Sequence, residues 1–322
     1  MTPKENLLRT IRRDQPEWVP DGMESVVRIH PPVVERPTAA GPDAFGVLWA
    51  FEAEAQGGTF PAHVEPVVSD LARWRAQVRI PDIEALDWNA VADQVSTLDR
   101  TASLVSGFVE MGLFERSYLL LGVEQALMAY LAEPDLMSAL LGALADYKIR
   151  LIEKFHAIAH LDMVWYGDDW GTQNALFLPP AVWRKIIKPH TQRIYNCMKS
   201  RGILINQHSC GKIEAIFGDI VEMGADIFNP CQPCNDLARF KREYGSRITF
   251  CGGIDSQFVL DRPGVTAAEV RAEVRRRIDE LCAGGGYIAA PSHSVPYNPE
   301  LLAAMKDEIA CYGRWRLGHT AR

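Results

Sequence analysis

From residue 100 onward, short β-rich runs alternate with segments of helical periodicity, and this alternation limits the possible folds more than any other feature. The β-rich runs are TASLVSGF, RSYLLLG, DMVWYGDD, GILINQHS, GADIFNP, RITFCGG and GGYIAAP. Nearly continuous apolar strands that are separated by crossover helices form parallel sheets with both faces covered. With about eight such strands, the pattern predicts an α/β fold, a closed (β/α)8 TIM barrel, rather than an open doubly wound sheet. No GxGxxG follows the first strand, so the sequence lacks the dinucleotide-binding fingerprint.

The first third of the chain is less regular. Residues 3–13 predict an amphipathic helix with Leu7, Leu8 and Ile11 on one face, and WVPDGMES predicts a first strand. Residues 30–90 are rich in Pro and Gly around FGVLWAFEAEA, which indicates a hairpin and irregular loops. A single barrel is compatible with 322 residues. We therefore expect one domain over residues 1–322, with residues 1–95 as an N-terminal helix, first strand and irregular insertion.

Composition restricts the partners. A net charge of −7, with 48% hydrophobic and 23% charged residues, is that of a globular protein without a nucleic-acid-binding surface. The N-terminus has no apolar signal-peptide core, and no apolar run reaches the roughly 18 residues of a membrane span. We therefore expect a cytoplasmic protein that binds neither nucleic acid nor membrane. Seven cysteines without a secretory signal fit reduced thiols or metal ligation better than disulfides.

Polar residues follow the predicted strands at their carboxyl ends, where barrels place catalytic groups. These residues are Glu124, Tyr166, Asp168, Asp169, His208, Cys210, Asn229, Gln232, Asp255, Ser292 and His293. Asp168 and Asp169 are adjacent, so they point to opposite faces of an extended strand and only one enters the barrel. Glu124 has a second interpretation, as a carboxylate in the first turn of the following helix.

The segment NQHSCGKIE, residues 206–214, contains a candidate metal-binding pair. His208 and Cys210 are two positions apart on a strand, so their side chains point to the same side with Cα atoms about 6.6 Å apart. This spacing lets an imidazole nitrogen and a thiolate share one tetrahedral zinc ion, with His293 as third ligand and an open fourth position. The alternative is a buried thiol beside a hydrogen-bonded histidine.

The order of several motifs resembles the uroporphyrinogen decarboxylase superfamily over most of the chain. The motifs are MTPKENLLRTIRRDQPEWVP, GDDWGTQ, LPPAVWRKIIKPHTQRI, HSCGKI, GADIFNPCQP, YGSRITFCGGID and GGGYIAAPSHSVPYNPELLAAM. The resemblance implies the barrel fold and a possible homodimer. Decarboxylases of this superfamily carry an Arg-rich MRQAGRY-type segment that grips substrate carboxylates, and this sequence has no such segment.

The other branch of the superfamily comprises cobamide-dependent methyltransferases, in which a His-x-Cys pair and a later Cys hold zinc. His208 and Cys210 match that pair, whereas His293 in PSH stands where the branch has the Cys of PGC. The resemblance implies Zn²⁺ and a corrinoid (cobamide) carried by a partner protein. An imidazole in place of the later thiolate makes the ion more electrophilic.

We therefore predict a zinc-dependent methyltransferase that acts on a small methylated substrate, with a corrinoid protein as methyl acceptor or donor. The expected catalytic residues are Asp168, Asp169 and Tyr166. The expected substrate-binding residues are Gln207, Asn229, Gln232, Asp255 and Glu124. Two alternatives stay open: a metal-free, decarboxylase-like lyase for a small carboxylate, and a non-catalytic barrel that binds a small molecule.

Overall fold

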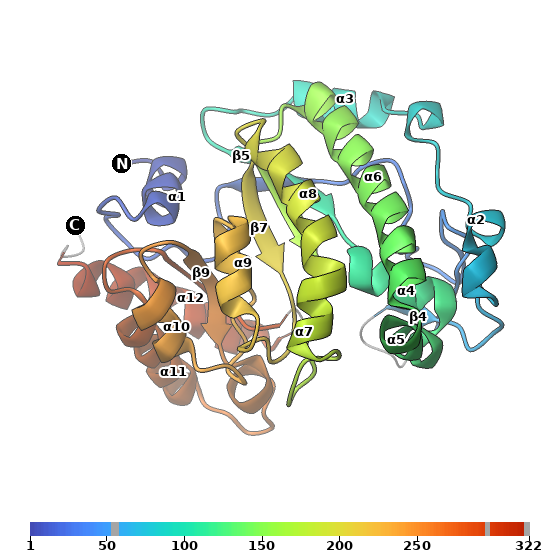
Figure 1. Ribbon diagram of the computed structural model, residues 1–322. Helices are drawn as coiled ribbons and strands as arrows, with labels where there is room; N and C mark the ends of the chain where they lie inside the picture. Colours follow the sequence, from blue (N-terminus) through green and yellow to red (C-terminus); the bar gives the residue numbers. More distant parts are fainter. Residues whose placement is uncertain (53–57, 294–296, 319–322) are drawn as a thin grey trace.

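The centre of the molecule is a curled sheet of seven parallel strands (Figure 1). The computed structural model describes residues 1–52, 58–293 and 297–318. In sheet order, the strands are β1 (Val26–Ile29), β5 (Leu104–Val109), β6 (Met163–Gly167), β7 (Leu204–His208), β8 (Ile227–Asn229), β9 (Thr249–Ile254) and β10 (Tyr287–Pro291). Every neighbouring pair is parallel, so the predicted α/β organisation is confirmed.

The two ends of the curled sheet meet at one residue pair. Asp21, ahead of β1, forms a parallel bridge with Ala289 of β10. The Ala289 N–H donates to the carbonyl of Pro20 at 2.9 Å, and the Gly22 N–H donates to the carbonyl of Ala289 at 2.7 Å. Among the described residues this sheet has seven strands and this bridge, so the closed eight-stranded barrel stays a prediction.

The segment RSYLLLG, which we expected to be a strand, is helical. It lies in α4 (Leu113–Leu121), whose residues are buried almost all round. A helix that is apolar on every side has no amphipathic period, so its sequence resembles a buried strand. This error accounts for the difference between about eight expected strands and seven observed. The first strand also lies later than expected, because residues 22–25, the second half of WVPDGMES, form a turn and β1 follows them.

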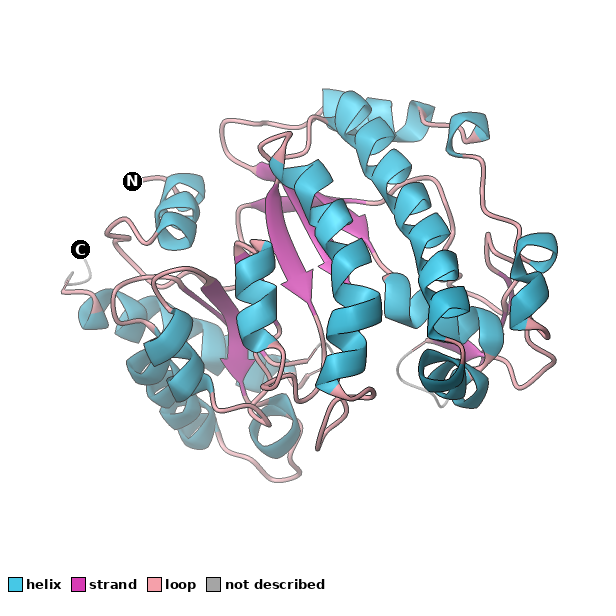
Figure 2. Cartoon of the chain, in the orientation of Figure 1, coloured by secondary structure: helices cyan, strands magenta, loops and turns pink. Residues whose placement is uncertain are grey.

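Helices cover the outer face of the sheet, as the cyan and magenta elements of Figure 2 show. Those after α4 are α5 (Val123–Ala132), α6 (Pro134–Ala159), α7 (Pro180–Val182), α8 (Lys188–Lys199), α9 (Phe217–Met223), α10 (Leu237–Tyr244), α11 (Ala267–Leu281) and α12 (Pro299–Arg316). Two π-helical segments, η3 (Trp183–Ile187) and η4 (Ser256–Leu260), precede α8 and α11. No single helix in the described part of the chain is both long and apolar enough to cross a membrane; α5 and α6 meet these two conditions only together, as a pair bent by 117°.

Helix α1 (Pro3–Arg12) covers the amino-terminal end of the sheet. Thr2 caps it by accepting the N–H of Glu5 at 3.2 Å, and Arg13 ends it in a left-handed conformation. Leu7 and Ile11 are buried in a separate inner cluster with the first residues of several strands. The predicted amphipathic helix is therefore confirmed, and its apolar face closes this end of the sheet.

The segment between β1 and β5 contains a small antiparallel sheet and four short helical elements. Its elements are β2 (Gly41–Pro42), β3 (Leu48–Phe51), β4 (Thr59–Pro61), η1 (Leu71–Arg73), α2 (Trp74–Gln77), η2 (Ile83–Ala85) and α3 (Asn89–Ser96). The pairing of β3 with β4 confirms the hairpin that was expected near FGVLWAFEAEA, although residues 53–57 lie outside the described residues.

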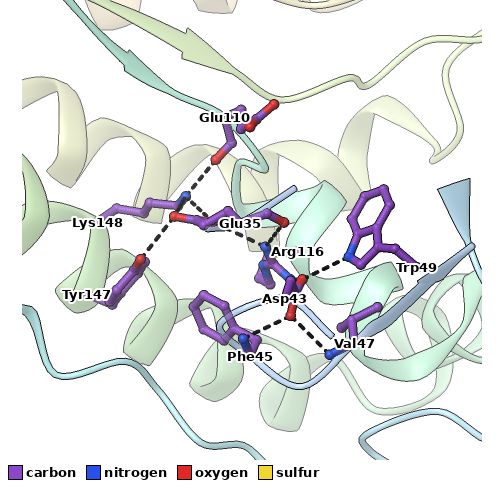
Figure 3. Close-up of polar contacts among 9 residues, drawn as sticks. All are labelled: Glu35, Asp43, Phe45, Val47, Trp49, Glu110, Arg116, Tyr147 and Lys148. Atoms are coloured by element: carbon purple, nitrogen blue, oxygen red, sulfur yellow. Dashed lines mark hydrogen bonds and ion pairs between the residues drawn. The ribbon is translucent and has the colours of Figure 1, made fainter. Parts of the chain in front are cut away.

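A buried ion network joins this segment to helices α4 and α6 (Figure 3). Arg116 of α4 contacts Asp43 at 2.6 Å and Glu35 at 3.3 Å. Lys148 of α6 lies 2.7 Å from both carboxylate oxygens of Glu35, and the Tyr147 hydroxyl donates to that carboxylate at 3.0 Å. Two cations and two anions balance one another, so we name the four charged residues the buried ion network.

Candidate metal centre at the carboxyl end of the sheet

A row of side chains crosses the inner face of the sheet on four neighbouring strands. The Arg28 guanidinium lies 4.7 Å from the Phe108 ring centre, Phe108 stacks on Trp165 at 4.2 Å, and Trp165 lies 4.6 Å from His208. Met163, two positions before Trp165, belongs to the inner cluster. Since strand side chains alternate between faces, Trp165 and His208 also point inward.

Asn229 sets the protonation pattern of His208. The Trp165 indole N–H donates to Asn229 Oδ1 at 3.3 Å, and His208 Nδ1 lies 2.6 Å from the same oxygen. An indole nitrogen can only donate, so the Asn229 atom must be its carbonyl oxygen. His208 Nδ1 therefore carries the hydrogen in the neutral ring, and Nε2 presents a lone pair. Metal-binding histidines are oriented in this way by a hydrogen bond from the other ring nitrogen.

Three potential ligand atoms converge beside this lone pair. The Cys210 sulfur lies 3.5 Å from His208 Nε2, and Asp169 Oδ1 lies 3.6 Å from it. One ligand atom from each of these three residues lies within 4.8 Å of the others. Asp169 also accepts the backbone N–H of Cys210 at 2.7 Å. We call Asp169, His208 and Cys210 the mouth cluster.

The charges of the mouth cluster favour a cation. Burial, and next the negative charge of Asp169, raise the pKa of the Cys210 thiol, while burial lowers the pKa of His208. Without a metal, burial therefore favours the neutral thiol of Cys210 and the neutral imidazole of His208. A divalent cation that replaced the thiol proton would balance the thiolate and the carboxylate together.

His293 was expected as the third ligand, but it does not belong to this cluster. Its side chain is exposed, its N–H donates to Ser256 Oγ at 2.9 Å, and its carbonyl accepts from the Tyr297 hydroxyl at 2.6 Å. It lines the cavity at the same end of the sheet, together with Gln232 and Asp255. The structure instead brings Asp169 into the third position, since the loop after β6 runs beside the loop after β7.

A cavity of about 350 Å³ opens beside the mouth cluster at the ends of β8, β9 and β10. Its lining includes the predicted residues Gln232, Asp255 and His293. Gln232 accepts the N–H of Gly211, next to Cys210, and so links the cavity to the cluster. Asp255 accepts the N–H of Phe258 at 2.9 Å and caps η4.

Asp168 is turned away from the opening, as expected for the neighbour of Asp169. Its side chain is fully buried and accepts the N–H groups of Phe114 at 3.1 Å and Glu115 at 3.0 Å, in the first turn of α4. A side chain at Gly112 would place its Cβ 2.3 Å from the Asp168 Cβ, so only glycine fits there. Burial raises the pKa of Asp168 to about 7. This carboxylate caps a helix, and the catalytic role that was expected for Asp168 stays a prediction.

Tyr166 and Gln207, for which site roles were expected, lie on the other face of the sheet. Both side chains are completely buried on the helix-covered face of the sheet, where the Tyr195 hydroxyl donates to Gln207 and the Tyr166 and Tyr195 rings lie 6.4 Å apart. They are the immediate neighbours of Trp165 and His208, so strand alternation directs them outward. Neither side chain reaches the opening.

Glu124 lies outside the site as well. It is exposed in the first turn of α5, which agrees with the alternative interpretation as a helix-end carboxylate. Glu115, in contrast, interacts electrostatically with the mouth cluster, although it was not among the site residues expected from the sequence. Burial and the charges of Asp169 and Asp168 raise its pKa well above the usual range, and its charge also acts on the Cys210 thiol. The available signal was the polar pair Glu115–Arg116 within an apolar run.

The fold and the mouth cluster together define an α/β protein with a candidate metal centre at the carboxyl end of a curled parallel sheet. The sequence profile described as "Uroporphyrinogen decarboxylase (URO-D)" matches residues 39–309. The chain therefore belongs to the URO-D family.

Curated relatives include both a methyltransferase and a decarboxylase. Methylcobamide:CoM methyltransferase MtaA of Methanosarcina barkeri is 29% identical over 134 residues, which cover 41% of this chain and 38% of that protein. Uroporphyrinogen decarboxylase of Nocardia farcinica is 26% identical over 261 residues, 77% of this chain and 71% of that protein. Among solved structures, a methyltransferase from Methanosarcina mazei has a TM-score of 0.73 at 16% identity, covering 97% of this chain and 99% of that one. This last similarity concerns the fold.

Proposed function

We propose that this protein is a zinc-dependent methyltransferase that acts on a small methylated substrate, with a corrinoid protein as methyl acceptor or donor. The observation that carries the proposal is the mouth cluster, in which His208, Cys210 and Asp169 direct three potential ligand atoms at one point. The methyltransferase MtaA among the relatives supports the choice of reaction.

The donor set suits zinc. Imidazole and thiolate are ligands that zinc prefers over magnesium or calcium, and a carboxylate is a common third ligand. The tautomer of His208 is already set by Asn229. When bound, zinc would supply a Lewis acid that stabilises negative charge on a substrate heteroatom.

The chain's own residues would position the reactants. Asn229 holds the imidazole of His208 in its orientation, and Asp169 holds the Cys210 backbone through the Cys210 N–H. The 350 Å³ cavity is large enough for a small organic substrate, and Gln232 and Asp255 supply polar atoms in its lining. Asp169 is partly exposed at the opening, where it would hold the metal together with His208 and Cys210.

The partner would act at the same opening. Among the described residues, helix α1 closes the other end of the sheet, so a corrinoid protein would approach the cavity from the carboxyl end. As part of the same proposal, we predict a cytoplasmic location, a homodimer and a single-domain organisation.

The experiment combines metal analysis with a methyl-transfer assay. Purified protein should contain about one zinc per chain, and methylated small molecules should lose their methyl group to added cob(I)alamin or a corrinoid protein. The Cys210→Ser variant should lose both zinc and transfer, whereas Cys311→Ser, at an exposed cysteine on α12, should keep both. Zinc-free protein that decarboxylates a small acid would contradict the proposal and favour the lyase alternative.

A further inference from the structure

A second pocket lies at the opposite, amino-terminal end of the sheet. It has a volume of about 460 Å³ and forms where α1, α10 and the turn before β10 meet. Its lining residues are Arg12, Arg13, Lys241, Gly245, Ser246, Ala283 and Gly284. Three of them are cationic and none is acidic. We call this the basal pocket.

The walls of the basal pocket are closely packed. Gly285 and Gly286 have φ values of 76° and 69°, and a Cβ on Gly286 would lie 3.0 Å from Arg13 Cγ. A Cβ on Gly285 would lie 3.3 Å from Arg13 Cα. The Lys241 ammonium donates to the carbonyl of Gly285 at 2.5 Å. Glycine is therefore required for this turn to contact the end of α1. The contacts with this turn fix the positions of Arg13 and Lys241.

The cations of the basal pocket lack counter-charges. Arg12 makes no hydrogen bond or ion pair with the residues that the structure describes. The hydrogen bonds of Arg13 and Lys241 go to neutral oxygens, Thr249 Oγ1 at 3.2 Å and a backbone carbonyl. The charge of Asp226 acts on Arg13, but both of its oxygens lie 2.7 Å from Lys199. Burial lowers the pKa of Lys241 to about 8, as expected where negative charge is scarce.

We propose that the basal pocket binds a phosphate-type oxyanion carried by a free small molecule. Guanidinium groups donate two parallel hydrogen bonds to tetrahedral oxyanions, and an ammonium group adds a third charged donor. The volume accommodates a phosphorylated metabolite. A bound anion would link Arg12 and Arg13 at the end of α1 to Lys241 of α10, and so hold α1 against the sheet. The basal pocket and its ligand are independent of the proposed methyl transfer.

Calorimetry and thermal unfolding with inorganic phosphate test the proposal, with sodium chloride at matched ionic strength as reference. Phosphate should raise the Tm of the full chain above the chloride value and slow amide exchange in α1. Arg12→Gln should weaken phosphate binding about tenfold, because it removes one charged donor. This variant should fold normally, since Arg12 is exposed. Arg9→Gln, one turn earlier on α1 and outside the pocket, is the matched control and should bind like the parent.

Equal Tm values in phosphate and chloride would overturn the proposal, as would unchanged phosphate binding by Arg12→Gln. A third arm separates a free ligand from a lipid headgroup. Vesicles of phosphatidylglycerol should not co-sediment the protein. Binding to those vesicles without binding to inorganic phosphate would overturn the free-ligand form of the proposal.

Discussion

The mouth cluster and the buried ion network are both groups of ionisable side chains, but only the network balances its charges within the chain. In the buried ion network, Arg116 and Lys148 match two carboxylates, and the charges sum to zero within the chain. In the mouth cluster, three potential ligands for a cation converge and no basic side chain pairs with them among the described residues. The first group holds two parts of the molecule together, whereas the second has the composition of a binding site.

The largest expected effect is the loss of zinc when a ligand residue of the mouth cluster is replaced. His208→Ala and Asp169→Asn should each reduce zinc to background, since each removes one of three ligands. His293→Ala should keep its zinc, because His293 lies outside the cluster. Zinc per chain is measured by plasma emission spectroscopy after dialysis. If Asp169→Asn kept its zinc and His293→Ala lost it, His293 rather than Asp169 would be the third ligand.

Breaking the buried ion network should lower the free energy of unfolding and leave the zinc content unchanged. Arg116→Met leaves Asp43 and Glu35 buried with less compensation, so the free energy of unfolding should fall by about 3–5 kcal/mol. Urea titration followed by circular dichroism measures the change. Lys154→Met, which removes an exposed ion pair with Glu84, should change it by less than about 1 kcal/mol. If the two variants proved equally stable, the network would not join the segments as described.

A smaller effect is expected from the residue that orients the imidazole. Asn229→Ala removes the acceptor for His208 Nδ1, and zinc affinity should fall by about 10- to 100-fold while the ligands remain. Competition with a fluorescent chelator gives the affinity. An unchanged affinity would show that the tautomer of His208 is not controlled by Asn229.

The smallest effect is a dependence of zinc affinity on pH. Because the pKa of the Cys210 thiol is raised, the thiol is protonated between pH 6 and 8, and zinc binding must release that proton. Affinity should therefore increase with pH, by at most about tenfold per unit for one proton. Isothermal titration in buffers of different ionisation enthalpy counts the protons released. Cys210→Ser should abolish the dependence along with tight binding.

The sequence was sufficient for the order of strands and helices because nearly continuous apolar runs identify buried parallel strands. It failed at RSYLLLG, where a helix buried on all sides has the same composition as a strand. The His208–Cys210 spacing predicted that these two side chains lie together, and their ligand atoms are 3.5 Å apart although Cys210 follows the end of β7. Applied to Trp165 and His208, the alternation of side chains along a strand directs their neighbours Tyr166 and Gln207 to the helix-covered face.

The third member of the mouth cluster and the role of Asn229 depend on how loops from different strands approach one another. Asp169 contacts Cys210 across 41 positions of sequence, and no local pattern specifies that approach. Sequence alone could therefore place Asp169 at the opening but could not decide between it and His293.

The position of α1 has a consequence for the order of events in any two-substrate reaction at this centre. In the described part of the chain, Leu7 and Ile11 fill the far end, so both reactants would approach the mouth cluster from the carboxyl end of the sheet. A macromolecule that docks there prevents the small molecule from entering or leaving. We therefore expect the small molecule to bind first, and a large excess of the protein partner to inhibit turnover.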